Sequence, residues 1–429
     1  MVEQLVYLIR LLRSRFFYGI LPCVFSTIYI EYHIIEINYF SLRKADGDTL
    51  LMLIELLYQK THLYLLNSRL FSTSVATVVS FTSAMLLFPA YIRLLRRLNI
   101  NAELESHSGK NAPVMPAGIL FMGIIGATCC ITARFNSYVN SALIIYFFFS
   151  IIGAFDDVVK VINKTRVSKG LKDKQEYQYK ADGISASLRL TLYLLVSAGV
   201  AAAAYKYIPN INGFNTVPFL SVLKDFPYFP FWLFIPFMAL AIAIMANGVN
   251  FTDGFDTLAV VPIITCSIFV GIIAYVSSHS LWSSYLLIPY IPRVDEILPL
   301  LGAIVGTLLA FLWFNSPPSS IIMGDSGAVG LGGTIGILFI FVKAGFYLPI
   351  VGFIFLLEFA SVVLQIFSFK TTGKRLFLRA PIHHHFQFMM RKNPFYNNEF
   401  YIRSKITWRF HIISIILLVV GLIIFFKVR

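Results

Sequence analysis

The sequence of 429 residues is short of charge. Only 13 % of its residues are Asp, Glu, Lys or Arg, and 58 % are hydrophobic, whereas soluble domains have about 25 % charged residues. So few charged groups would leave most of the surface of a folded chain apolar in water. The composition therefore excludes an ordinary soluble protein and indicates an integral membrane protein.

Cysteines are also scarce, and their spacing does not suggest a metal site. The four cysteines are Cys23, Cys129, Cys130 and Cys266, and all lie in apolar stretches. We expect them to pack in the interior rather than to form disulfides or bind metal. The sequence contains no HExxH motif, so it lacks the zinc ligands of that class of metalloprotease.

Acidic residues are fewer than basic residues in this sequence. The chain has 21 Asp and Glu against 35 Lys and Arg, which gives a formal net charge of +14. A nucleic-acid partner is one explanation for a basic chain, but these basic residues gather in a few loops between apolar segments. That distribution is typical of the cytoplasmic loops of membrane proteins. We therefore expect a lipid bilayer, and no nucleic acid, as the partner.

Ten apolar segments after residue 68 approach the length of about 20 residues that a membrane-spanning helix needs. They predict an all-α, polytopic fold with about ten transmembrane helices in a single domain, residues 52–429. Residues 1–51 are apolar but contain Glu31, His33 and Glu36, which leaves two explanations open: an extra span, or a non-native start before Met52. The predicted spans are 70–95, 116–134, 140–157, 184–206, 229–248, 257–278, 297–315, 327–344, 347–369 and 407–427.

The loops between these spans alternate in charge, which orients the predicted bundle. Loops rich in Lys and Arg are cytoplasmic by the positive-inside rule, so both ends of the ten-helix core face outward. The unusual polar residues then converge on the cytoplasmic side, which favours an enzyme over a solute channel. The basic loops carry Arg96, Arg97 and Lys110; then Lys160, Lys164, Arg166, Lys169, Lys172, Lys174 and Lys180; and finally Lys370, Lys374, Arg375, Arg379, Arg391, Lys392, Arg403 and Lys405.

Two adjacent carboxylates, Asp156 and Asp157, end one nearly uncharged span in the sequence GAFDDVVKV. Carboxylates near hydrocarbon are costly and indicate function. A structural explanation is an Asp–Lys pair with Lys160 at helical spacing, worth a few tenths of a kcal/mol. One carboxylate would serve that purpose, whereas two repel each other unless a cation compensates them. The pair therefore favours a functional site.

A second polar segment, NGVNFTDGFDTLA, places Asn247, Asn250, Asp253 and Asp256 at intervals of three residues. A helical turn would align these side chains on one side, and Gly254 makes a helix break plausible. Amide and carboxylate oxygens suit a hard divalent cation or the polar edges of a sugar or base. The segment is more acidic than a simple turn between two helices requires.

The third segment, MGDSGAVGLGG, has Asp325 between Gly324 and Gly327, where the backbone can approach a ligand closely. A helix is expected to begin near Ser326, and helix N-termini attract phosphate. An Asp at that position favours a bridging Mg²⁺, which takes one or two carboxylates plus substrate phosphates. The structural alternative is an Asp that caps the helix.

The fourth segment, APIHHHFQ, contains three consecutive histidines, His383, His384 and His385. Three successive side chains cannot all point one way on a helix, so a three-histidine zinc site is not expected. The neighbouring cations suggest an anion-binding lid. Together the four segments supply carboxylates, an implied Mg²⁺ and cationic or histidine donors, an inventory that fits phosphoryl transfer from a pyrophosphate substrate.

In its order of DDxxK, NxxNxxDGxD, MGDxG and APIHHHF, the chain resembles the phospho-N-acetylmuramoyl-pentapeptide transferases. These belong to the polyprenyl-phosphate N-acetylhexosamine-1-phosphate transferases. The likeness covers roughly residues 52–429 and includes the stretches LLIPYIP, FLWFN and LEFASVVLQIFSFKTTGKRLF. It implies a ten-helix fold, commonly a homodimer, with a cytoplasmic active-site cleft in the bacterial inner membrane.

The resemblance also implies a reaction. UDP-N-acetylmuramoyl-pentapeptide and undecaprenyl phosphate would give lipid I and UMP with Mg²⁺, a step of peptidoglycan synthesis on which cell shape and division depend. By motif, the resemblance gives catalytic roles to Asp156, Asp157, Asp325 and His383, with Asp325 as the Mg²⁺ ligand and the Asp156–Asp157 pair at the lipid phosphate. It gives substrate binding to Lys110, Lys160, Asn247, Asn250, Asp253, Asp256, Gln365, Ala380, His384 and His385.

The sequence departs from the family pattern near the nucleotide. The family usually has Thr-Pro-Thr-Met-Gly-Gly where residues 112–117 read Ala-Pro-Val-Met-Pro-Ala, and a Phe where Ile322 stands. Glu176 replaces a common Lys, and segment 388–405 is longer than usual. Loss of a stacking ring predicts nucleotide binding weaker than is typical of the family.

Two other functions are consistent with parts of the sequence. A sibling enzyme that loads N-acetylglucosamine phosphate onto the same lipid would share the Asp motifs, although it usually has a different histidine loop. A non-catalytic transporter or scaffold that kept an ancestral pocket would also share them. The APIHHHF motif favours the muramoyl branch.

Overall fold

The computed structural model describes residues 57–58, 60–62, 64–98, 100, 112–168, 183–211, 230–393, 395–396 and 398–427. All of them belong to one structural unit, residues 51–429. The predicted extension 1–51, the predicted substrate contact Lys110 and the basic residues from Lys169 to Lys180 lie outside the described residues.

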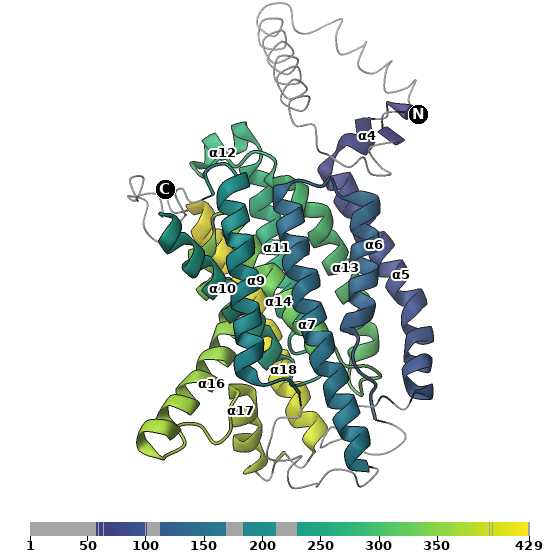
Figure 1. Cartoon of the computed structure of the whole chain (residues 1–429), viewed down its shortest axis with the longest axis vertical. Coiled ribbons are helices and arrows are strands. Elements are labelled where there is room, and N and C mark those ends of the chain that lie inside the picture. The colour runs from purple at the N-terminus through teal and green to yellow at the C-terminus, as the bar shows by residue number, and fades with distance from the viewer. Residues whose placement is uncertain are drawn as a thin grey trace, which may run out of the picture. The chain divides into compact units, whose positions relative to one another are not determined.

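Helices make up most of the described part of the chain, which contains no β-strand. Nine of the described helices are long and apolar enough to cross a membrane, so the predicted all-α polytopic fold is confirmed. In chain order (Figure 1) the helices are α4 Tyr64–Asn67, α5 Arg69–Arg97, α6 Gly118–Thr132, α7 Ser137–Ser168, α9 Ala186–Tyr207, α10 Phe231–Thr252, α11 Val260–Ser277, α12 Ser280–Leu286, η2 Val294–Ile297, α13 Leu298–Asn315, α14 Gly324–Phe341, η3 Gly345–Tyr347, α15 Leu348–Val351, α16 Phe353–Thr372, α17 Ile382–Arg391 and α18 Glu399–Lys427.

The predicted span 116–134 forms a shorter helix than expected. It corresponds to α6, whose 15 residues reach about 22 Å at 1.5 Å per residue, less than the hydrocarbon thickness of about 30 Å. The preceding residues 112–117 are not helical and lie beside residues 320–323. The Val114 N–H donates to the Ser320 carbonyl (3.1 Å), and the Ile322 N–H donates to the Val114 carbonyl (2.9 Å). This short ladder uses residues that would otherwise extend the helix.

Helix α14 lies at the centre of the bundle, where 94 % of its residues are buried. Its glycines let neighbouring helices approach closely. A Cβ on Gly330 would lie 1.9 Å from Ser150 Oγ on α7, and one on Gly332 would lie 2.8 Å from the Met245 carbonyl on α10. Small residues serve this purpose in membrane bundles, where close packing replaces the hydrophobic driving force. Helix α14, which carries Asp325 in its first turn, is thereby fixed between α7 and α10.

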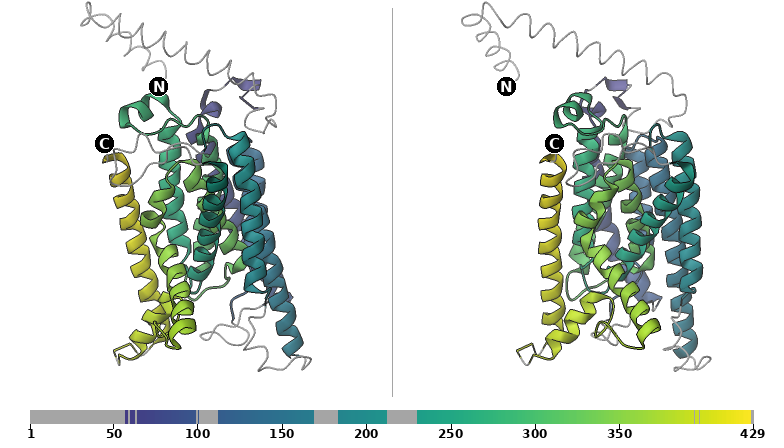
Figure 2. Two further views of the ribbon diagram at one scale, coloured as in Figure 1. Left: turned by 60° about the vertical axis from the view of Figure 1, so that its left-hand side comes forward. Right: turned by 90° about the vertical axis from the view of Figure 1, so that its left-hand side faces the viewer.

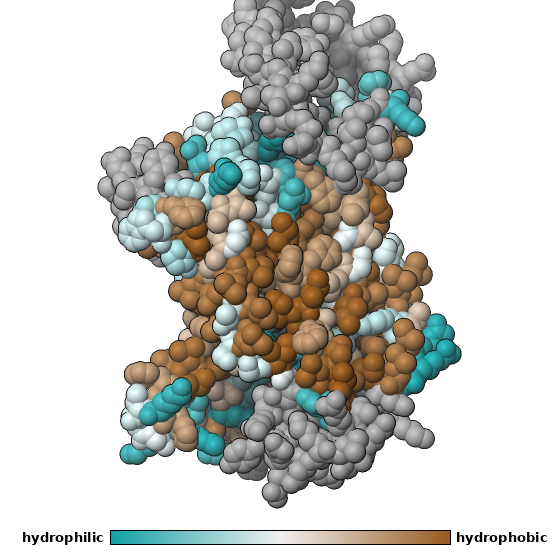
Figure 3. Space-filling model, in the orientation of Figure 1, coloured by the Kyte–Doolittle hydropathy of each residue, from teal (hydrophilic) through white to brown (hydrophobic). Residues whose placement is uncertain are grey.

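The outer helices expose apolar side chains instead. In the most apolar 18-residue stretches of α5, α9, α16 and α18, only 22–28 % of the residues are buried. Leu86, Leu195 and Phe367 are among the exposed residues of these helices. On the face drawn in Figure 3, hydrophobic residues form a band between two more hydrophilic ends. Such a band matches a bilayer, which solvates apolar side chains between two polar interfaces.

The helices alternate in direction through the bundle. The start of α5 and the end of α18 lie at the same end, and α17 lies at the opposite end (Figures 1 and 2). We call the end with α17 the site end and the opposite end the far end. The site end gathers the end of α7, the start of α9, the end of α10 and the start of α14. These are the helix termini that carry the polar motifs.

Candidate functional site

The paired carboxylates lie within α7, not at its end as the sequence predicted. The helix continues to Ser168, because the residues after Asp157 keep a helical pattern and Lys160 pairs with Asp156 at i,i+4 (2.8 Å). Asp156 and Asp157 are both fully buried. Asp156 Oδ1 accepts a hydrogen bond from the Ile184 N–H (2.6 Å). The pair therefore faces neighbouring helices and not open solvent.

The two members of the pair have different partners. Asp157 accepts hydrogen bonds from the backbone N–H groups of Asp325 (3.2 Å) and Ser326 (3.0 Å). These groups belong to the first turn of α14, where a helix has unsatisfied N–H donors and a positive partial charge. Asp157 thus caps α14 from another helix and fixes the backbone that carries Asp325. Asp156 instead contacts side-chain cations.

Two cations join the DD and MGDSG motifs. Lys160 Nζ lies 2.8 Å from Asp156 Oδ2 and 2.9 Å from Asp325 Oδ2. Arg189 Nη1 bridges the same two oxygens at 2.9 and 2.8 Å. Three helices, α7, α9 and α14, therefore meet in one four-residue charge network. Asp325 keeps 14 % of its side chain exposed and is the carboxylate of this network that faces outward.

Arg189 was not among the residues singled out from the sequence. It is a cation inside the apolar span 184–206. An ionisable residue in a membrane-spanning segment indicates function, so this signal was available. The sequence did not reveal the partners of Arg189, because Asp156 and Asp325 are 33 and 136 positions away along the chain.

The amide-and-carboxylate segment forms the end of α10 and the turn after it. Asn247 and Asn250 lie on α10, Asp253 directly follows it, and all three are half-buried. The helix ends at Thr252, close to the predicted break, so the predicted helical alignment of the four residues does not extend to Asp256. Burial, together with the charges of neighbouring carboxylates, Asp325 first among them, raises the pKa of the Asp253 carboxyl well above its ordinary value. Several carboxylates therefore lie close to one another around this turn.

Two further hydrogen bonds attach this turn to the loop before α14. Ser319 Oγ donates to Asp256 Oδ1 (2.9 Å). Asn315, the last residue of α13, accepts from the Thr257 N–H (2.7 Å) and donates to the Ile321 carbonyl (2.8 Å). Asn315 was also missed from the sequence, where it is one polar residue ending an apolar run. Its buried amide holds the two loops together.

The three histidines belong to α17 and point to different partners, as helix geometry predicted. His383 is buried, with Nδ1 3.1 Å from Glu358 Oε2. His384 Nδ1 lies 2.8 Å from Gln387 Oε1, and His385 Nδ1 accepts from the Leu378 N–H (3.1 Å). Burial, and then the adjacent His383, lower the pKa of His384 to about 4. His384 is therefore neutral near pH 7.

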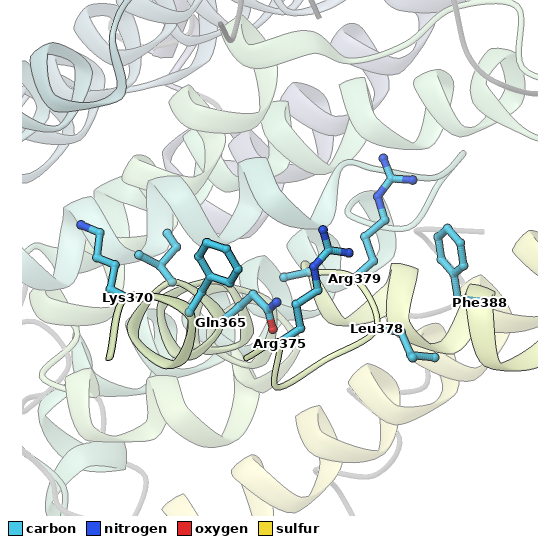
Figure 4. Close-up of a pocket in the computed structure, with 9 residues that line it drawn as sticks. Gln365, Lys370, Arg375, Leu378, Arg379 and Phe388 are labelled. Carbon is cyan, nitrogen blue, oxygen red and sulfur yellow. The ribbon is translucent and has the colours of Figure 1, made fainter. Parts of the chain in front are cut away.

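A cavity of about 610 Å³ lies between the end of α16, the following loop and α17 (Figure 4). Two predicted substrate contacts, Gln365 and Ala380, line it together with cationic and apolar residues. Gln365 Oε1 also accepts from the Phe377 N–H (2.8 Å), which shapes the loop. Three cations from two elements favour an anionic ligand. The cationic lining residues are Lys370, Arg375 and Arg379.

The donor set at the site end suits a hard cation, although it does not form a complete metal site. Within the described ranges, no three acidic, His or Cys side chains converge as a metal cage. Mg²⁺ needs only one or two protein carboxylates when substrate phosphates complete its coordination. The exposed edge of Asp325 and the raised pKa of Asp253 fit a cation that arrives with an anionic substrate.

The fold and the site together define a class: a polytopic membrane protein with a carboxylate-rich site at one end of its helix bundle. Residues 139–343 match the model of glycosyl transferase family 4, the superfamily of polyprenyl-phosphate sugar-1-phosphate transferases. The match covers slightly less than half of the chain, from α7 through α14. It contains Asp156, Asp157, Asn247 to Asp256 and Asp325, and it supports a membrane sugar-phosphate transferase.

Proposed function

We propose that the chain transfers phospho-N-acetylmuramoyl-pentapeptide from its UDP carrier to undecaprenyl phosphate, forming lipid I and UMP. The observation that carries this proposal is the convergence of four separate motifs on one end of the bundle. Asp156 and Asp325 share two cations, and His383 of the APIHHHF motif lies against Gly254. The family match supports the transferase class. The histidine motif, outside the matched range, supports the muramoyl branch.

The geometry suits the positioning of two phosphates. The attacking lipid phosphate is a monoester and is largely ionised near neutrality, with a second pKa of about 6, so orientation matters more than a strong base. Lys160 and Arg189 are placed to hold anionic oxygens beside Asp156. Asp157 accepts hydrogen bonds from the Asp325 and Ser326 N–H groups and so fixes the start of α14, which holds the Asp325 side chain in place beside the cations. Bound at Asp325, Mg²⁺ would neutralise the pyrophosphate and stabilise the leaving UMP.

We assign the nucleotide-sugar to the side of the four-residue charge network that faces the end of α10 and α17. Asn250, Asp253 and Asp256 offer polar oxygens and amides to the sugar and base. The basic cavity lined by Arg375 and Arg379 would accept an anionic group of the same substrate, and both guanidinium groups extend to the same side of the loop (Figure 4). The substrate would therefore lie along the site end from α10 to α17.

The proposal includes a cellular setting. We place the protein in the bacterial cytoplasmic membrane with the site end towards the cytoplasm, because the basic loops flank that end. The nucleotide-sugar is a water-soluble cytoplasmic molecule and the acceptor is a lipid, so a site at one membrane surface serves both. A homodimer is proposed from the family resemblance.

Supplying each UDP-sugar to the purified protein with undecaprenyl phosphate tests this function. We expect labelled lipid product from UDP-N-acetylmuramoyl-pentapeptide and little from UDP-N-acetylglucosamine. The reverse preference would assign the chain to the sibling enzymes. Absence of lipid product from both sugars, in a folded sample with Mg²⁺, would favour a non-catalytic scaffold.

A further inference from the structure

A buried acid on α16 has no role in the site described so far. Glu358 is fully buried in a helix long and apolar enough to span the membrane. An ionisable side chain in such a segment is costly and is usually retained for function. The helix passes close to the site, because a Cβ on Gly248 of α10 would lie 2.7 Å from the Phe355 carbonyl. Glu358 follows Phe355 by about one turn.

The contact of Glu358 is the first histidine of α17. His383 Nδ1 lies 3.1 Å from Glu358 Oε2, and the side chains are 1 % and 0 % exposed. Within the described part of the chain, no hydrogen-bond partner is found for either carboxylate oxygen or for either ring nitrogen. The 3.1 Å approach of Nδ1 to Oε2 is thus an ion-pair contact without the alignment of a hydrogen bond, and it is the polar contact that the structure gives these four atoms. A buried carboxylate so placed fixes both the orientation and the tautomer of the ring.

The opposite nitrogen of His383 faces the substrate-binding turn. A Cβ on Gly254 would lie 2.3 Å from His383 Nε2, so only glycine permits this approach beside Asp253. The Phe255 ring, whose centroid lies 4.6 Å from that of the imidazole, meets it edge to face. A buried nitrogen without a hydrogen-bond partner has a free-energy cost. A ligand that reaches this turn could remove that cost.

We propose that Glu358 is a positioning residue that acts through His383. Its carboxylate holds Nδ1–H and so directs Nε2 to a phosphate oxygen of the nucleotide-sugar at the Asp253–Gly254 turn. Glu358 itself does not contact the substrate. The inference deepens the proposed function and rests on it for the identity of the ligand. The pairing of the two side chains is independent of that identity.

A double-mutant cycle tests whether Glu358 acts through His383. Full-length protein in nanodiscs is assayed as wild type, Glu358→Gln, His383→Gln and the double variant. We expect Glu358→Gln to lower kcat/KM for the UDP-sugar by about 10–100-fold, the range for partners that orient a site histidine, with KM for the lipid phosphate unchanged. In the double variant, Glu358→Gln should change the rate by less than about twofold relative to His383→Gln alone. The effects of substitutions within one interaction network are not additive.

Glu296→Gln is the matched control. Glu296 is also a buried acid (3 % exposed), but it lies at the far end and pairs with Arg69 (2.5 Å). We expect it to alter thermal stability and leave kcat and KM unchanged. Full additivity in the cycle, or wild-type kinetics for Glu358→Gln, would overturn the proposal. Equal kinetic losses in Glu296→Gln and Glu358→Gln would reduce Glu358 to a stability role.

A spectroscopic readout separates this inference from the proposed function. Solid-state NMR of the ¹⁵N-histidine-labelled protein reports which ring nitrogen carries the proton, and His383→Gln assigns the signal. We expect a protonated Nδ1 for His383 in the wild type and a changed signal in Glu358→Gln. If no UDP-sugar is turned over but this signal is found, the proposed function fails and the pairing stands. An unprotonated Nδ1 in the wild type contradicts the pairing whatever the activity.

Discussion

Among the described residues, buried charged side chains gather in a cluster at each end of the bundle, and these two clusters are built differently. At the far end, Arg69 on α5 pairs with Glu296 at 2.5 Å and lies 3.9 Å from Asp295. At the site end, Lys160 and Arg189 each bridge two carboxylates from different helices. Three more carboxylates lie in the motifs around that network: Asp157, Asp253 and Asp256.

The difference between the clusters lies in their balance of charge. A single guanidinium that ties α5 to η2 is sufficient to explain the far cluster as a structural link. Both clusters have more acids than cations, but the surplus is larger at the site end, where five carboxylates lie around two cations and the pKa of Asp253 is raised by burial and by its acidic neighbours. Such a surplus is unfavourable for folding alone. It indicates a site that completes its charge balance with a cation and a substrate.

The largest expected effect is from Asp325→Asn. We expect transfer to fall by about 10²–10³-fold, the cost of removing one group that stabilises transition-state charge, with little loss of thermal stability. The matched change at the far end, Glu296→Gln, should leave the rate unchanged. UMP release and thermal unfolding of both variants measure this. Similar rates for Asp325→Asn and wild type would remove the distinction between the clusters.

Arg189→Leu is expected to lower the rate by about 10–100-fold, because Asp156 and Asp325 lose a shared partner that orients them. Arg189→Lys should recover part of the activity, since it restores the charge without the guanidinium. The corresponding Arg69→Leu should instead lower the free energy of unfolding by about 3–5 kcal/mol, because it removes one partner of the buried ion pair with Glu296. Kinetics and unfolding are measured on all three variants. Similar losses of rate and of stability in Arg189→Leu and Arg69→Leu would show that the two clusters have the same role.

Acid should destabilise the site end through His384. Its pKa is about 4 in the folded protein against an ordinary value of 6.5, so the unfolded chain takes up a proton at a higher pH. This contribution to stability is complete above pH 6.5 and is lost as the pH falls from 6.5 towards 4. Thermal unfolding across that range, compared with His384→Asn, measures it. Parallel pH profiles for the two proteins would show that His384 does not carry the effect.

The smallest expected effect concerns the nucleotide. Ile322 is half-buried, and its N–H donates to Val114 in the ladder beside the site. Both departures from the family pattern, residues 112–117 and Ile322, therefore lie in one place. We expect Ile322→Phe to tighten UMP binding by about threefold to tenfold, because aromatic–base stacking contributes about 1–3 kcal/mol. Calorimetric titration with UMP measures this, and unchanged affinity would count against stacking at this position.

The fold class and most residues of the candidate site could be predicted from the sequence alone. Apolar runs long enough to span a bilayer are unmistakable, and a carboxylate such as Asp325 is conspicuous in an otherwise apolar chain. The spacing of Asn247 and Asn250 predicted a helical turn, and both residues lie on α10, whereas Asp253 follows the end of this helix. These signals are local, so they survive without knowledge of the fold.

What the sequence did not reveal depends on contacts between distant segments. The pairing of residues 112–117 with 320–323 shortens α6, and it joins backbones about 200 positions apart. The different partners of Asp156 and Asp157 depend on where α14 begins and where Arg189 lies. Glu358 was visible as a lone acid in an apolar span, but its contact with His383 depends on where α17 lies.

The central claim is that the site end catalyses transfer of a sugar phosphate to a lipid phosphate. The most direct test is UMP release from UDP-N-acetylmuramoyl-pentapeptide by the purified protein. We predict release that requires both Mg²⁺ and undecaprenyl phosphate and that is lost in Asp325→Asn. Release without the lipid phosphate would contradict direct transfer between the substrates. No release by a folded wild-type protein with all components present would contradict the account as a whole.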